Sequence, residues 1–259
     1  MKTACRAYAE AVPGATIAEL LALVARNPGR PRLTWYGDGG ERVELSGAVL
    51  ENWVNKTTNL LVEEFDAGPG TRVLLDLPGH WRTVVWALAA WRCGATVAVA
   101  GTGSDLVVTD RPADHAGGAA PVVAVALPAL ARRVDDLPRG ALDAASAVST
   151  YGDALGWVPA VDPSATAWAA RDWQATHAEL VALATSRAPA PDARRVLCEA
   201  RDATVALDAV AALAADASLV LASTSVAARL RDDADARARL VGPERVDADL
   251  LDTLRSTLS

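Results

Sequence analysis

The strongest constraint on the fold is a strand–helix–strand pattern that occurs twice in the chain. The first copy, residues 71–101, has two apolar runs separated by a helical pattern that stops at Gly94. The second copy, residues 195–222, repeats this order and carries Glu199 in the place of Asp76. Because a helix connects the two strands of each copy, the strands must pair in parallel with a right-handed crossover.

The repeat predicts an α/β protein with two similar subdomains, each a mostly parallel β-sheet flanked by helices. Glycines and prolines interrupt any regular pattern between Tyr151 and Asp172, and this stretch marks the expected boundary. We therefore expect a first subdomain at residues 1–150 and a second at 151–259. The chain has 259 residues, of which 51% are hydrophobic, and this is enough to bury a large core.

The remaining elements are predicted from local signals. Two capping boxes, Thr16-x-x-Glu19 and Thr176-x-x-Glu179, mark helix starts, and the turn at residues 37–40 predicts a β-hairpin. Further helices are expected at residues 129–133, 141–147, 226–240 and 247–258.

Composition excludes several classes of function. The net charge is −7 and no basic run exceeds a pair, so we expect no nucleic-acid partner. No run of 18 apolar residues and no signal-peptide core occurs, so we expect no membrane association and a cytoplasmic protein. The three cysteines, Cys5, Cys93 and Cys198, lack the spacing of a metal or redox site. We therefore expect neither a metal nor another cofactor.

The helix of the first copy is apolar on almost every side. Trp81 and Trp91 lie on one face and Trp86 on another. Such a helix is buried on two sides, and we favour burial within its own chain over burial against a partner subunit. The three tryptophans are the interface candidates if the protein forms a dimer.

Several phrases resemble, in order, the adenylate-forming superfamily of acyl-CoA synthetases and their relatives. Residues 31–35, PRLTW, are similar to the family phrase P-x-L-T-Y, and residues 92–95, RCGA, to K-x-G-A. Leu106 to Asp110 is similar to a family strand of the type A-D-x-V-V-x-D. Residues 176–180, THAEL, resemble the T-H-x-N-L that follows the family's phosphate loop. The resemblance implies the fold of the family's N-terminal domain.

The departures from the family concern ATP. The family holds the ATP phosphates on a loop rich in Gly, Ser and Thr that contains a lysine, because backbone N–H groups must approach the phosphates closely. The corresponding window, residues 163–174, has neither glycine nor lysine, and the chain's two lysines are Lys2 and Lys56. The sequence also ends before the family's later ATP-binding motifs. We expect an acyl-CoA synthetase-like protein that is unable to adenylate.

In an open parallel sheet, ligands bind beyond the carboxyl ends of the strands. The residues expected there are His80, Thr176, His177, Glu199 and Arg201. We assign them to binding of a small acyl or nucleotide-like ligand and predict no catalytic residue. The alternative for Arg201 is a salt bridge to Asp202 that closes the pocket.

Three functions stay open at this stage. The first is a small-molecule-binding or protein-interaction module. The second is an enzyme with residual acyl or acyl-adenylate chemistry, in which His177 acts as a base. The third is a subunit that docks to a full-length relative or to its own copy.

Overall fold

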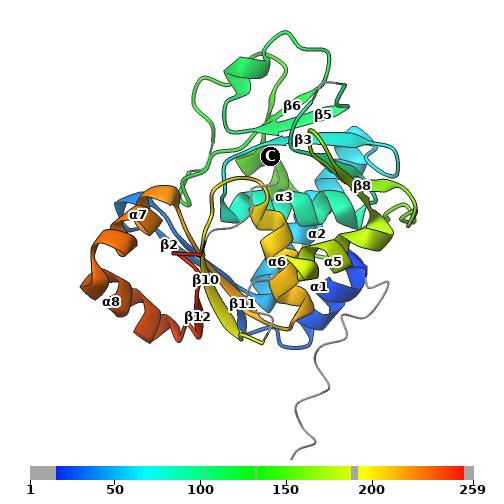
Figure 1. Cartoon of the computed structure of the whole chain (residues 1–259). Helices are drawn as coiled ribbons and strands as arrows, with labels where there is room; N and C mark the ends of the chain where they lie inside the picture. Colours follow the sequence, from blue (N-terminus) through cyan, green and yellow to red (C-terminus); the bar gives the residue numbers. More distant parts are fainter. Residues whose placement is uncertain (1–15, 102, 132, 188–191, 254–259) are drawn as a thin grey trace, which may run out of the picture.

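The computed structural model describes residues 16–101, 103–131, 133–187 and 192–253, which form two β-sheets with helices between and beside them (Figure 1). The α-helices are α1 (Ile17–Ala25), α2 (Gly47–Phe65), α3 (Trp81–Arg92), α4 (Ala144–Thr150), α5 (His177–Ser186), α6 (Val205–Ala214), α7 (Thr224–Asp232) and α8 (Ala234–Glu244). Two short 3₁₀ turns are η1 (Asp38–Gly40) and η2 (Pro112–His115). The predicted α/β fold class is confirmed.

The first sheet has seven strands in the order β7-β6-β5-β3-β4-β8-β9, all parallel except for the antiparallel hairpin β8–β9. Its strands are β3 (Arg72–Asp76), β4 (Thr96–Ala98), β5 (Leu106–Thr109), β6 (Val122–Ala124), β7 (Leu142–Asp143), β8 (Thr166–Ala169) and β9 (Gln174–Thr176). The first strand–helix–strand copy therefore forms β3, α3 and β4 at the centre of this sheet.

The second sheet has five strands in the order β12-β10-β11-β1-β2. Its strands are β1 (Pro31–Tyr36), β2 (Arg42–Ser46), β10 (Arg195–Glu199), β11 (Ser218–Ala222) and β12 (Ala248–Asp249). The second copy forms β10, α6 and β11, with its strands parallel as predicted. Each sheet contains strands from before and after residue 150, and the proposed boundary there stays a prediction.

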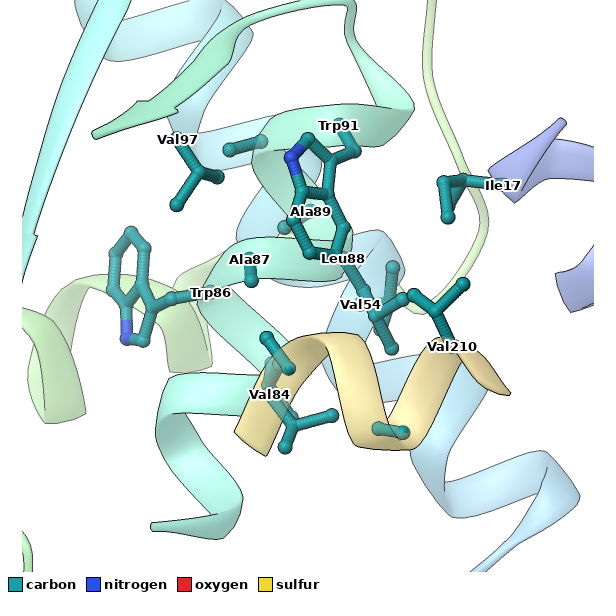
Figure 2. Close-up of a cluster of buried hydrophobic side chains, with 14 of the residues drawn as sticks. Ile17, Val54, Val84, Trp86, Ala87, Leu88, Ala89, Trp91, Val97 and Val210 are labelled. Carbon is teal, nitrogen blue, oxygen red and sulfur yellow. The ribbon is translucent and has the colours of Figure 1, made fainter. Parts of the chain in front are cut away.

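Helix α3 is buried within its own chain, as its composition predicts. It contacts α1, α2 and α6 as well as strands of both sheets. Figure 2 shows Val84 of α3 beside α6, with Trp86 and Trp91 directed to different sides of the helix. Trp81, Trp86 and Trp91 are each at most 4% exposed. The chain's own core therefore covers these tryptophans, as we favoured, and a dimer stays an untested prediction.

The local signals were accurate where they rested on side-chain chemistry. Both capping boxes are present, with Glu19 and Glu179 accepting hydrogen bonds from the backbone N–H groups of Thr16 and Thr176. The hairpin predicted across residues 37–40 is formed by β1 and β2.

All four of the further predicted helices are wrong or differ in extent. The helix expected at 141–147 is α4, which begins only at Ala144 because residues 142–143 pair as β7, and runs to Thr150. Residues 128–131 form a turn in which Leu130 is almost fully exposed, since this short segment has no apolar face to bury. The helix expected at 226–240 is broken at Asp233, which caps α8 by accepting a hydrogen bond from the Ala236 N–H. The expected helix at 247–258 begins instead with strand β12, because pairing with β10 outweighs helical propensity. Residues 254–258 of this prediction, and residue 132 of the helix expected at 129–133, lie outside the described residues.

Candidate functional site

A cavity of about 350 Å³ lies at the carboxyl ends of β3, β4 and β8, where the fold predicts a ligand site. Leu75, Leu77, Val99 and other small apolar residues line it, together with Asp76, Arg171, Asp202 and Thr204. The polar groups come from three different segments: the end of β3, the turn of the β8–β9 hairpin, and the start of α6. We call it the strand-end cavity.

Asp76 is the most extensively hydrogen-bonded residue of this cavity. Its carboxylate accepts hydrogen bonds from Arg111 (2.7 Å) and Thr109 (3.1 Å) and is 2.8 Å from Nε2 of His115. Burial acts to raise the pKa of Asp76, but the hydrogen bonds from His115 and Thr109 and the charge of Arg111 outweigh it and hold the pKa below its usual value. Asp76 is therefore a fixed carboxylate at neutral pH.

His115 corrects an expectation from the sequence. A loop of glycines and alanines around it predicts an exposed side chain, whereas its side chain is only 24% exposed and is held by Asp76. The two residues are 39 positions apart, and no local pattern connects them. Only the parallel pairing of β3 with β5 brings their segments together.

Glu199, the counterpart of Asp76 in the second copy, is enclosed by arginines. Its side chain is 8% exposed and pairs with Arg201 (2.9 Å) and with Arg231 of α7 (2.5 Å). Burial acts to raise the pKa of Glu199, and the bonds to the two arginines lower it overall. Arg201 therefore pairs with Glu199 and not with Asp202, whose carboxylate caps the turn before α6 through Thr204.

His80 caps helix α3 inside the core. Its Nδ1 accepts a hydrogen bond from the Arg82 N–H at 3.2 Å, and its ring packs edge-on against Trp35. The residue is 3% exposed. Burial, helped by the neighbouring Arg82 charge, lowers the pKa of His80 to about 3, so the imidazole is neutral at physiological pH.

His177 begins helix α5 after Thr176 and is also buried, at 8% exposure. Its Nε2 lies 3.1 Å from the carbonyl oxygen of Gly94, which accepts a hydrogen bond from the Nε2–H tautomer. Burial lowers the pKa of His177. The side chain of Thr176 is engaged by Glu179 in the capping box.

None of the five predicted ligand residues is among those that line the strand-end cavity. The cavity does use the segments beside His80 and Arg201, since Leu77 and Asp202 line it. The residues that face it are instead Asp76, Arg171, Asp202 and Thr204. Arg171 and Thr204 had no sequence signal as ligand groups.

A contact between the two copies sets the shape of this region. Gly79, in the turn after β3, lies so close to the turn after β10 that an added Cβ would be 2.4 Å from the carbonyl carbon of Ala200. The ends of the two copies therefore touch backbone to backbone.

The window expected to replace the phosphate loop is the hairpin β8–β9. Its turn, residues 170–173, carries Arg171 to the strand-end cavity. The hydroxyl of Ser164 donates to Asp162, and that of Thr166 to Gln174, so both are engaged within the chain. Among the residues that the structure describes, no cluster of His, Cys, Asp or Glu has the geometry of a metal site. None of the described helices combines the length and hydropathy needed to span a membrane.

Comparison with solved structures identifies the class of fold. The chain has the fold of the N-terminal domain of the adenylate-forming superfamily. It superimposes on an acyl-CoA synthetase of Brucella canis with a TM-score of 0.67 at 19% identity, covering 93% of this chain and 51% of that one. An artificially fused adenylation–PCP di-domain NRPS from Klebsiella oxytoca, NpsA-ThdA, matches with a TM-score of 0.65 at 15% identity, covering 89% and 42%. An amide bond synthetase of Marinactinospora thermotolerans, in a mutant form, gives 0.62 at 15%, covering 90% and 48%.

Among curated proteins, a TIGR03089 family protein of Mycobacterium tuberculosis is 37% identical over 150 residues, covering 54% of this chain and 61% of the relative. No family model matches the sequence. The chain spans about half the length of the solved structures and less than two thirds of this relative. The chain thus shares the fold of these acyl-CoA synthetase and adenylation structures.

Proposed function

We propose that this chain binds a small acyl-type ligand in the strand-end cavity and does not form acyl-adenylates. The observation that carries the proposal is the cavity itself, which has an apolar floor of Leu75, Leu77 and Val99 and lies beside the ends of three strands. Its volume of about 350 Å³ is near the lower limit of small-molecule sites.

The charges at the rim favour a ligand with an anionic end. Arg171 has no carboxylate partner among the described residues, and it is the one cationic side chain that lines the described cavity. An anionic group on an apolar ligand, such as the phosphate of an acyl-adenylate, would pair with its guanidinium, which matches two oxygens at once. Asp76 and Asp202 are engaged by neighbouring donors and leave Arg171 as the available charged group.

The expected loss of adenylation rests on the hairpin and not on the length of the chain. Binding of ATP phosphates requires close backbone approach and cationic support for the developing charge. The hairpin from Thr166 to Thr176 has no glycine, and its alanines carry Cβ atoms where a phosphate loop exposes backbone.

The alternative of residual acyl chemistry would use His177 as a base. Its Nε2 is engaged by the Gly94 carbonyl, and the residue does not line the strand-end cavity. We therefore favour a module that binds a small molecule. Protein interaction is a second, equally non-catalytic role for the same chain.

A thermal-shift titration tests the proposal with Mg-ATP, AMP, CoA and a non-hydrolysable acyl-adenylate analogue. A ligand present at 100 times its dissociation constant adds about 2.7 kcal/mol of stability. We expect the acyl-adenylate analogue to raise the melting temperature and Mg-ATP to leave it unchanged. A shift with Mg-ATP would contradict the loss of phosphate binding, and silence with every ligand would contradict the cavity's role.

A further inference from the structure

A second cavity, of about 310 Å³, lies beside η2 and shares no described lining residue with the strand-end cavity. It is lined by His115, by the loop from Ala116 to Pro121, and by a facing segment that contains Arg139. The loop carries two successive glycines, and Gly117 adopts a left-handed conformation with φ of 81°. We call it the loop cavity.

The loop cavity is rich in hydrogen-bond donors that the protein does not use. Within the described chain, the backbone N–H groups of Gly117, Ala119 and Ala120 have no protein acceptor. Arg139 is exposed, and its guanidinium forms no ion pair or hydrogen bond with any residue that the structure describes. Because glycine has no Cβ, an oxyanion can approach this backbone closely.

His115 lies at the wall of the loop cavity in a fixed orientation. Its Nε2 is 2.8 Å from the carboxylate of Asp76, which holds the ring beside the loop.

We propose that the loop cavity binds a phosphate group carried by a small ligand, at a site separate from the strand-end cavity. Three N–H groups and an arginine fork are more donors than the two oxygens of a carboxylate can accept. A tetrahedral phosphate offers its oxygens in several directions and matches a glycine-containing backbone and a guanidinium together.

The test is a titration with inorganic phosphate, in which binding is monitored through the ¹H–¹⁵N resonances of Gly117 and Gly118. We expect these amides to shift saturably, and Arg139→Gln to weaken binding about 10-fold or more. The matched control is Arg133→Gln, since Arg133 is also exposed, does not line the loop cavity and pairs with Asp135. The proposal is overturned if the glycine amides do not shift or if Arg139→Gln binds as the wild type does. It is also overturned if Arg171→Gln abolishes binding instead, because the anion then occupies the strand-end cavity.

Discussion

Asp76 and Glu199 end equivalent strands of the two strand–helix–strand copies, yet their surroundings differ completely. Asp76 faces the strand-end cavity and is held from behind by Thr109, Arg111 and His115. Glu199 is enclosed by Arg201 and Arg231 and lines neither the strand-end cavity nor the loop cavity. The same backbone pattern thus leaves one strand end open and the other closed.

The difference comes from what packs beside each copy. Next to β10, helix α7 contributes Arg231, whose guanidinium spans Glu199 and the carbonyl oxygen of Leu251. Next to β3, the partners of Asp76 are Thr109 at the end of β5 and Arg111 and His115 just after it. They leave Asp76 at the wall of the strand-end cavity. A repeated fold element therefore does not imply a repeated site.

The largest expected effect tests whether both copies share one core. Trp91→Ala removes a side chain that is 1% exposed and whose Nε1–H donates to the carbonyl oxygen of Ala167. We expect a loss of about 3–5 kcal/mol in the free energy of unfolding, with a single transition in urea. Trp157→Ala is the control, since Trp157 is 76% exposed and should change stability by less than about 0.5 kcal/mol. Two separate unfolding transitions would show that the copies are independent units.

The next effect concerns the contact between the two strand ends. Gly79→Ala places a Cβ against the backbone of Ala200, which cannot move aside as a flexible side chain would. We expect a loss of about 1–3 kcal/mol, measured by urea unfolding. Gly29→Ala is the matched control, because nothing lies within 4 Å of its Cβ position. Equal stability of the two variants would mean that the copies do not touch at this point.

The buried histidine of the first copy predicts a pH dependence. The unfolded chain protonates His80 near pH 6.5, whereas the folded protein does so at about 3. Between these values the unfolded state binds one more proton, so stability falls as the pH drops, by about 1.4 kcal/mol per pH unit. His80→Asn keeps a capping acceptor and should flatten the unfolding free energy between pH 6 and 5. An unchanged slope would contradict the burial of a neutral imidazole.

The smallest expected effect compares the two carboxylates directly. Glu199→Gln weakens the pairing of Arg201 and Arg231 and should cost about 1 kcal/mol without changing ligand binding. Asp76→Asn should instead alter the affinity of the strand-end cavity, measured by calorimetry. If both variants change affinity equally, the open and closed strand ends are not distinct.

The fold was predictable because its signals are local and repeated. Apolar runs of strand length on either side of a helical pattern define β3–α3–β4 and β10–α6–β11, and the capping boxes at Thr16 and Thr176 mark α1 and α5. The predictions were wrong for segments that lack such signals. β12 forms only because β10 offers an edge, and no property of residues 247–252 alone indicates it.

The candidate site was less predictable because side-chain direction depends on tertiary pairing. The strand ends were located correctly, but His80 and His177 turn into the core, where each forms a hydrogen bond with the backbone. The pairing of Asp76 with His115 follows from the neighbouring positions of β3 and β5. The order of strands depends on how the whole sheet assembles, and local patterns in one sequence do not predict it.

The most direct test of the account is calorimetric binding of the acyl-adenylate analogue to the wild type and to Ala170→Trp. Ala170 lines the strand-end cavity from the hairpin turn, and an indole there would fill it. We predict that the wild type binds and that the variant, with an unchanged melting temperature, does not. Equal binding by both proteins would place the ligand elsewhere and contradict the proposed role of the strand-end cavity.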